Sequence, residues 1–438
     1  MPSESISQSV PFDPADPRAT LTQLPASPAV FALYGAEAHA EPYIGRTPNL
    51  RARLERLLLP SEKHPRRLQL AGRVRRIAYR LTGSEFESLL AQFSLLEEVY
   101  GERALERMHL RAPAFIRFLG SNRFPRIAVT HRPSQREAAW AYGPFASRAQ
   151  AERFADEALK LFLLRRCTEE LDPDPAHPGC VYSEMKMCLA PCYQGCTDGR
   201  YAEEAAEVER FLATLGESRL VTLRTERDQA SAVLAFEQAA AVHAQVQRVE
   251  AVRALAAELV RPMNQLRAVL LQAAAEPGSV AVFLYDAGRL RGPALFSTLG
   301  MRIQNEQSGS TSLFAQPLAV EPVPEEQGPG TEGLATEGPA ADGQGSSAAA
   351  ARKARGLLEA RMEAALEELA AMGGGSSAAV RQGHLALLKR WYYRPEARRA
   401  GEIFFAGEDG RWPVKALLRG AGRVAAKMLA PEAESAQN

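Results

Sequence analysis

The sequence has few cysteines, no long apolar run and almost no net charge, and each shortage excludes a class of protein. Five cysteines in 438 residues are too few for a disulfide-based secreted fold, so we expect a cytoplasmic, reducing compartment. No apolar stretch reaches the roughly 18 residues that a membrane span needs. The first twenty residues are polar and lack the basic and apolar parts of a secretory signal. We therefore expect neither a membrane partner nor a secretory route.

The near-neutral total hides local concentrations of charge. The chain has 53 basic and 52 acidic residues, for a net charge of +1. Residues 44–80 hold eleven Lys or Arg against two Glu, and residues 381–427 hold eleven against four acidic residues. Residues 321–351 carry six acidic residues and no basic one. The basic stretches favour a polyanion such as nucleic acid, with a solvated helix surface as the alternative.

Apolar periodicity and turn residues predict an α+β fold of several small units. Strands at 29–34, 41–45 and 77–82 and helices at 50–59 and 85–99 make a small mixed α/β domain over residues 21–105. Ser84 and Glu87 are predicted to form a capping box at the start of the second helix. The other predicted regions are a disordered start at 1–20, connecting strands and the cysteines at 106–200, a helical hairpin at 201–262, a small β-containing unit at 263–318, a flexible acidic linker at 319–351 and a helical, basic region at 352–438.

Finer expectations concern the later helices and strands. Helices are predicted at 147–164, 201–215, 220–259 and 350–371, and a β-hairpin at 280–284 and 289–295. The aromatic cluster Trp391–Tyr393 beside basic residues is expected either to stack on unpaired bases or to belong to a core.

The first domain brings together residues that suit a phosphodiester. Tyr43 ends a predicted strand, Arg46 follows the next turn, and Arg53 lies on the following helix. A phenol and two guanidinium groups around one point would bind a phosphate and stabilise charge on it. The alternative is a half-buried packing tyrosine with solvated arginines.

All five cysteines lie between positions 167 and 196, which indicates that their thiols act together. Cys167, Cys180, Cys188 and Cys192 are separated by twelve, seven and three residues, and Cys196 lies outside this pattern as a spare thiol. Four thiolates from one stretch can ligate an iron–sulfur cluster or a tetrahedral Zn²⁺. Reduced, unligated thiols are the remaining alternative.

These motifs resemble the UvrC family of excision-repair endonucleases over roughly residues 20–300. Ala29–Phe31, Tyr43–Gly45 and the basic run Arg46–Leu54 resemble its GIY-YIG nuclease domain. The cysteine spacing is similar to the one that holds a [4Fe-4S] iron–sulfur cluster in that family, with Zn as the alternative. Residues 234–240 match the core of the UVR motif, and Tyr142–Phe145 resembles a further family segment.

The resemblance implies roles for individual residues. Tyr43, Arg46 and Arg53 would act at the scissile phosphate with Mg or Mn, and damaged duplex DNA would contact Asn49, Arg51 and Arg56. The UVR helical hairpin would bind a UvrB-type helicase subunit through Phe236, Glu237 and Ala240, unless Phe236 is simply core. After Gly300 the carboxylates of a second nuclease domain are not found, which resembles the short Cho-type proteins that cut on the 3′ side.

Four positions depart from the family at the expected chemistry. Arg46 stands in place of the usual lysine and keeps its charge, and Phe115 stands where the family has an asparagine. Phe31 stands where the family has a tyrosine, and Gln92 stands where it has a metal-ligating glutamate. An amide is a poor Mg²⁺ ligand, because this ion prefers charged oxygen. Two hypotheses follow: an excinuclease that makes the 3′-side incision near a lesion, or a catalytically degenerate GIY-YIG protein that binds DNA and UvrB without nuclease activity.

Overall fold

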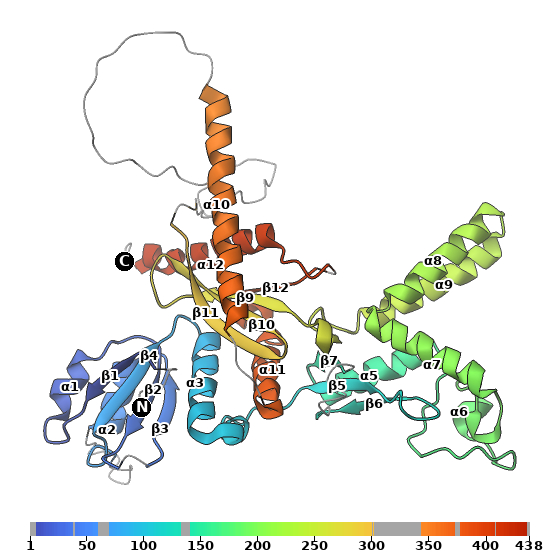
Figure 1. Cartoon of the computed structure of the whole chain (residues 1–438), viewed down its shortest axis with the longest axis horizontal. Coiled ribbons are helices and arrows are strands. Elements are labelled where there is room, and N and C mark those ends of the chain that lie inside the picture. The colour runs from blue at the N-terminus through green and yellow to red at the C-terminus, as the bar shows by residue number, and fades with distance from the viewer. Residues whose placement is uncertain are drawn as a thin grey trace. The chain divides into compact units, whose positions relative to one another are not determined.

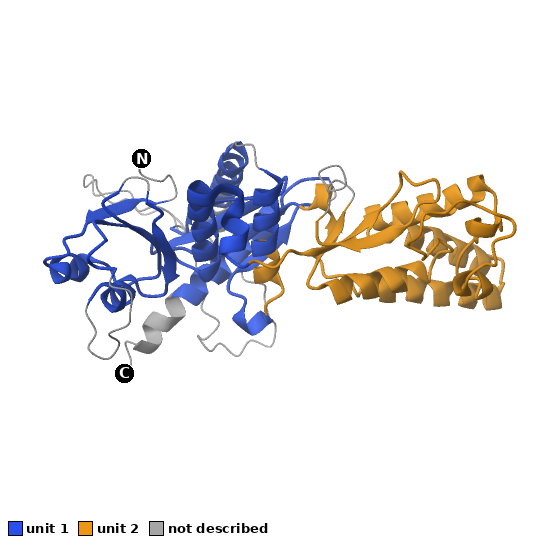
Figure 2. Ribbon diagram, turned by 90° about the horizontal axis from the view of Figure 1, so that it is seen from below, with its two compact units in different colours: residues 1–109, 267–387, 395–438 blue, residues 110–266, 388–394 orange. Residues whose placement is uncertain are grey.

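The described part of the chain has an α+β fold with three small sheets, which confirms the predicted class (Figure 1). The computed structural model describes residues 6–37, 40–59, 70–132, 141–299, 301, 343–372, 377–407 and 409–435. The chain forms two compact units, coloured separately in Figure 2. Unit 1 comprises residues 1–109, 267–387 and 395–438, and unit 2 comprises residues 110–266 and 388–394.

The first sheet belongs to unit 1 and has the strand order β1-β4-β2-β3, with every pair antiparallel. Its strands are β1 (Gln8–Pro11), β2 (Ala29–Tyr34), β3 (Tyr43–Thr47) and β4 (Arg76–Leu81). Alternate residues of β2 face opposite sides, as a strand requires. Phe31 packs on the side of α1 (Pro17–Gln23) and α2 (Leu50–Leu58), whereas Val30 packs on the side of α3 (Glu85–Tyr100).

Two local predictions in this domain need correction. Residues 1–20 were expected to be disordered, but residues 8–11 pair with β4 and Pro17 opens α1, whose N-cap is Asp16. The Ser84 cap of α3 is confirmed, because its hydroxyl accepts a hydrogen bond from the Glu87 N–H. The Glu87 carboxylate accepts from the Gly83 N–H, 2.8 Å away, rather than from the N–H of Ser84.

The second sheet joins two stretches of chain that were predicted as separate units. Its order is β11-β10-β9-β12, from β9 (Ala268–Ala273), β10 (Ser279–Asp286), β11 (Arg289–Ser297) and β12 (Glu402–Phe405). The predicted 280–295 hairpin is confirmed as β10–β11. β12 pairs with β9, so the region after 352 completes the sheet of the 263–318 unit.

Helices cover both faces of this second sheet. α10 (Gly343–Ala371) and α12 (Val414–Ser435) pack on one face through Leu358, Leu417 and their neighbours. α10 begins at Gly343 rather than Ala350, and the part of the predicted linker before residue 343 lies outside the described residues. On the other face, Phe86 of α3 meets Phe283 of β10 edge to face at 5.2 Å between ring centroids. Unit 1 therefore has the first domain and the second sheet packed together.

Unit 2 contains the third sheet and the helical hairpin. The sheet order is β6-β5-β7-β8, from β5 (Ala114–Phe118), β6 (Ile127–Thr130), β7 (Tyr142–Phe145) and β8 (Arg261–Pro262). Its helices are α5 (Arg148–Leu159), the short α6 (Val181–Glu184), α7 (Asp198–Ala213), α8 (Glu217–Ala232) and α9 (Phe236–Arg253). The predicted helix 220–259 is broken at residues 233–235, so the hairpin is formed by α8 and α9. The helix predicted at 147–164 is α5, which ends at Leu159.

Two further helices, α4 and α11, lie where the chain passes from one compact unit to the other. α4 (Ala104–Arg107) is a single turn after α3. α11 (Ala378–Tyr392) begins in unit 1 and ends in unit 2. In unit 1 its His384 ring packs on Phe93 of α3, at 5.3 Å between ring centroids.

Candidate functional site

Phe31 and Tyr43 are neighbours on the α2 side of the first sheet. Their ring centroids lie 6.1 Å apart; Phe31 is buried and Tyr43 is 40% exposed. Phe31 pairs with Gly45 across the ladder, where an added Cβ would lie 2.8 Å from Cζ of the Phe31 ring. Glycine at this position therefore leaves the space that the Phe31 ring occupies. Tyr43 presents its phenol to solvent beside an apolar ring that offers no hydroxyl.

Arg46 does not join this pair. Tyr43 lies opposite Leu33 in the ladder, but Arg46 lies opposite Val30, whose side chain faces α3. The Arg46 guanidinium forms an ion pair at 3.6 Å with Glu85, in the first turn of α3. Because strand residues alternate between faces, Tyr43 and Arg46 point away from each other. The predicted convergence of both on one phosphate was wrong; Arg53 lies half-buried on α2, which covers the Tyr43 face.

The three predicted DNA contacts of α2 differ in their availability. The Asn49 side chain is the N-cap, accepting from the Ala52 N–H at 2.9 Å. Arg51 donates from Nε to the Leu24 carbonyl at 2.7 Å and is half-buried. Arg56 is exposed, and its Nε donates to the Ala52 carbonyl within the same helix. Of these three residues, Arg56 alone falls in the exposed class.

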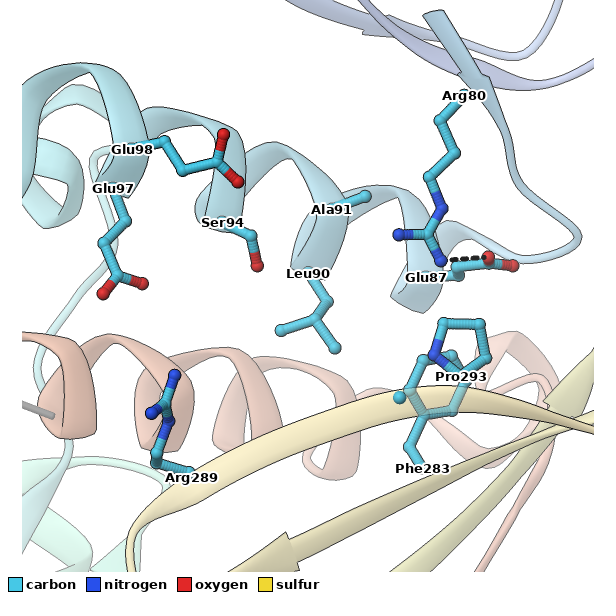
Figure 3. A pocket seen from close by; sticks show the side chains of 11 residues that line it. Arg80, Glu87, Leu90, Ala91, Ser94, Glu97, Glu98, Phe283, Arg289 and Pro293 are labelled. Carbon is cyan, nitrogen blue, oxygen red and sulfur yellow. Dashed lines mark hydrogen bonds and ion pairs between the residues drawn. The ribbon is translucent and has the colours of Figure 1, made fainter. Parts of the chain in front are cut away.

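A cavity of about 420 Å³ lies in unit 1 between α3, β4 and the second sheet (Figure 3). Its lining from α3 repeats at helical spacing: Glu87, Leu90, Ala91, Ser94, Glu97 and Glu98. At about 100° per residue, Gln92 points roughly half a turn away from that face. Gln92 is half-buried and lies outside the cavity lining. The carboxylates in the cavity therefore do not stand at the position of the family's glutamate.

The cavity mixes both signs of charge. Glu87 is buried beside Arg80, with 3.5 Å between its carboxylate and the guanidinium. Burial raises the pKa of Glu87, and the hydrogen bond from Gly83 and the charge of Arg80 partly oppose that rise. Burial likewise raises the pKa of Glu97, and Arg289 opposes it. Paired guanidinium and carboxylate groups of this kind do not make an anion site.

Four of the five cysteines share one environment in unit 2. Burial raises the pKa of Cys188 to about 11; the Ala190 N–H, 3.3 Å from its sulfur, lowers it, and the nearby Cys167, Cys192 and Cys180 raise it further. The pKa of Cys196 is also raised, by burial and then by Asp198, with Arg200 opposing. The Cys188 thiol is thus close enough to the other three thiols to interact with them electrostatically. All five are free cysteines.

The residues present fit a four-thiolate group in kind. In the described residues no three His, Cys, Asp or Glu side chains are already arranged around one metal position. Some buried donors of this unit have no hydrogen-bond acceptor: Nε of Arg126, and Nε and Nη2 of Arg166, whose guanidinium lies 5.8 Å from the centre of the Tyr182 ring. Arg166 directly precedes Cys167 in the sequence. Four sulfur donors beside unsatisfied cationic donors suit an anionic sulfur-ligated group.

The connection between α8 and α9 presents an apolar tip, which we define as Val233, Leu234 and Phe236. Their side chains are 74%, 71% and 64% exposed. The hairpin core is made by other residues, among them Leu223 and Val246. Phe236 is therefore not a core residue, and Glu237 and Ala240 are exposed beside it.

Trp391 belongs to the core, because it is only 3% exposed. In unit 2, the Tyr393 hydroxyl donates to the Pro144 carbonyl at 2.9 Å. The alternative that this cluster stacks on unpaired bases is therefore wrong for Trp391.

Comparison with known proteins agrees with the resemblance over part of the chain. Residues 115–211 match the UvrC/Cho excinuclease middle domain. UvrABC system protein C of Alcanivorax borkumensis is 30% identical over 240 residues, which are 54% of this chain and 39% of that protein. The protein of the same name from Ruegeria sp. is 27% identical over 288 residues, 64% of this chain and 44% of that protein.

Over this part of its length the chain is UvrC/Cho-like. UvrABC system protein C of Aromatoleum aromaticum is a further relative, 29% identical over 270 residues, with 62% of this chain and 44% of that protein covered. The chain thus spans about two-fifths of the length of these relatives. No solved structure matched the chain. Each helix that the structure describes is too short or too polar to cross a bilayer.

The UvrC/Cho-like segment holds all four predicted cysteines together with residues that sequence reasoning missed. Arg165 is buried, and its backbone N–H donates to the Tyr201 hydroxyl at 3.1 Å. Glu204 accepts from the Leu163 N–H at 2.7 Å. The only signal for Arg165 in the sequence was a basic pair directly before the first cysteine, which reads as an ordinary surface feature.

Proposed function

We propose that this UvrC/Cho-like chain acts in nucleotide excision repair, where it binds damaged DNA together with a UvrB-type helicase subunit. The observation that carries the proposal is the match of residues 115–211 to the excinuclease middle domain, a segment that contains Cys167, Cys180, Cys188 and Cys192. Relatives over more than half of the chain are UvrABC system protein C, which agrees with this pathway.

The apolar tip of the hairpin supports the protein partner. Two helices that pack through their own core hold Leu234 and Phe236 out in solvent. Exposed aromatic and aliphatic side chains at one point suit a protein interface, because their burial there is favourable. We assign this tip to the UvrB-type subunit, with Glu237 and Ala240 beside it.

The basic helix α2 supports contact with DNA. Its arginines would address phosphates, so binding should depend on salt and little on sequence. Arg56 is the best placed of the three predicted contacts, since Asn49 caps the helix and Arg51 is held by Leu24.

For the GIY-YIG-like domain, the geometry supports a binding module without nuclease activity best. Phe31 lacks a hydroxyl, Gln92 offers an amide in place of a carboxylate, and Arg46 is paired on the opposite face from Tyr43. Without its carboxylate ligand, a catalytic Mg or Mn would be bound weakly.

The second candidate is 3′-side incision of a phosphodiester near the lesion. It is favoured by the exposed phenol of Tyr43 on the sheet face that α2 and Arg53 cover. Water would be the nucleophile, and Arg53 would stabilise negative charge on the phosphate.

The four cysteines would hold the cofactor. Cys167, Cys180, Cys188 and Cys192 suit a [4Fe-4S] cluster, with Zn as the alternative, and either group supplies a covalent link between distant parts of the loop. An iron–sulfur cluster would also accept or donate one electron. Binding would release the thiol protons, so the high pKa of Cys188 should be lost on loading.

An incision assay separates the two candidates. Anaerobically purified full-length protein is mixed with a UvrB-type subunit, Mg²⁺ or Mn²⁺, and an end-labelled duplex that carries one bulky lesion; Gln92→Glu and Tyr43→Phe are run alongside. Cutting by wild type that Tyr43→Phe abolishes establishes the nuclease. Cutting by Gln92→Glu alone establishes a degenerate nuclease scaffold. Retained binding without any cutting supports the binding module, and absence of lesion and partner binding would overturn the proposal.

A further inference from the structure

Arg165 is held in a fixed position beside the first of the four cysteines. Its side chain is buried, at 3% exposure. Nε donates to the Phe124 carbonyl at 2.9 Å, and Nη1 donates to the Glu169 carbonyl at 2.7 Å. The same Nη1 lies 3.6 Å from Sγ of Cys167, within hydrogen-bond reach of sulfur. One guanidinium therefore links two backbone segments to a predicted metal ligand.

The charge of Arg165 has no carboxylate partner in the part of the chain that the structure describes. Its side-chain hydrogen bonds go to two carbonyls and a thiol. Burying a cation without a counter-charge is unfavourable, so such groups are normally paired with an anion.

The surroundings of Cys167 add further positive charge instead of cancelling it. Arg126 is half-buried and lies close enough to Arg165, Arg117 and Cys167 to interact with them electrostatically. Arg126 and Arg166 also keep buried nitrogen atoms without acceptors. A buried guanidinium beside Cys167 is better compensated when that sulfur belongs to an anionic group. Four thiolates around Zn²⁺ or an iron–sulfur core carry such an excess of negative charge.

We propose that Arg165 is a positioning residue of the four-cysteine site, where it orients Sγ of Cys167 and compensates the negative charge of the thiolate-bound group. The inference rests on the proposed cofactor. Donors next to ligating atoms set ligand orientation and tune the bound metal. For an iron–sulfur cluster, the positive charge favours the reduced state, which carries one more electron, and so raises the reduction potential.

A purely structural role for Arg165 makes a different prediction. If it only ties Phe124 and Glu169 to the core, substitution would change stability but not the properties of a bound metal. Arg165→Lys keeps the charge and loses the planar fork, whereas Arg165→Gln loses the charge. Arg153→Gln is the matched control, because Arg153 is an exposed arginine of α5 in the same unit.

The test uses full-length protein purified without oxygen and loaded with iron and sulfide, or with Zn²⁺. Iron, sulfide and zinc contents, the visible absorption spectrum and the rate of metal release to a chelator are measured for each variant. We expect wild type and Arg153→Gln to retain metal equally, and Arg165→Gln to release it about 10- to 100-fold faster. If the group is iron–sulfur, Arg165→Gln should have a lower reduction potential than wild type, and Arg165→Lys should stay close to wild type.

The outcomes separate the inference from the cofactor on which it rests. Metal loading of wild type with equal release and potential in Arg165→Gln overturns the role of Arg165 alone. Failure of wild type to load either metal overturns the cofactor and this role together. If Arg165→Gln does not fold, Arg126→Gln removes a neighbouring positive charge from a half-buried position. It should shift release and potential in the same direction, and an unchanged value would refute the inference.

Discussion

Replacing Phe236 by alanine should weaken binding of a UvrB-type partner and leave the hairpin folded. Phe236 is 64% exposed, so only about a third of it is buried in the free protein. Full burial of a phenylalanine is worth about 1.5–3 kcal/mol, so the loss of stability should be about 0.5–1 kcal/mol. An aromatic residue at the centre of an interface contributes about 2 kcal/mol or more, which corresponds to roughly 30-fold in Kd.

The assay compares binding and stability in the same variants. Full-length protein is titrated into a fluorescently labelled UvrB-type subunit, and anisotropy gives Kd; far-UV circular dichroism follows thermal unfolding. Val221→Ala is the matched control, since Val221 is 55% exposed on α8 of the same hairpin but outside the apolar tip. Val246→Ala shows what loss of the hairpin core looks like, because Val246 is buried between the helices.

An unchanged Kd in Phe236→Ala with normal unfolding would refute the docking role of the tip. An equal loss in Val221→Ala would mean that any exposed apolar residue of the hairpin matters. Leu234→Gly adds an independent check: Leu234 has φ +61°, which glycine adopts without strain. This variant should keep or gain stability and still bind the partner more weakly.

Three further predictions concern unit 1. The pKa of His384 is lowered to about 3, first by burial and then by the charges of Arg289 and Arg291. The unfolded chain therefore binds a proton at this histidine below about pH 6.5, whereas the folded protein keeps it neutral down to about pH 3. The free energy of unfolding should thus fall by about 1.4 kcal/mol for each pH unit as the pH drops from 6.5 to 3. Denaturant unfolding measured across this pH range should show a weaker dependence of that free energy on pH in His384→Gln. Gly383→Ala should lower the free energy of unfolding by about 1–3 kcal/mol, and with it the melting temperature, because the added Cβ would lie 2.1 Å from Phe93 Cζ. An unchanged melting curve would contradict this packing. Arg56→Glu should weaken DNA binding without changing the melting temperature. The negative slope of the logarithm of the DNA association constant against the logarithm of the salt concentration should become less steep by about 0.9. An unchanged slope would show that Arg56 does not contact the DNA.

Much of the first domain could be predicted from local pattern. The apolar run of β2, the leucine spacing of α2 and the Ser84 cap of α3 each act within a few residues, so their structural consequence is written in the sequence nearby. The break at residues 233–235 was missed because Ala-rich helical periodicity continues through it. The strand β1 was missed because it is short and exposed, and its pairing with β4 stabilises it.

The sequence alone determined the α+β class, the clustering of four cysteines and the apolar motif that becomes the hairpin tip. These features depend on composition and spacing, which do not change on folding. Only the tertiary structure decided that Arg46 faces away from Tyr43, since strand register assigns each side chain to a face. It also decided that β12 completes the second sheet and that Arg165 meets Cys167, with no carboxylate partner among the described residues. Pairing between distant strands and burial of a charge depend on the whole fold, so no local pattern reveals them.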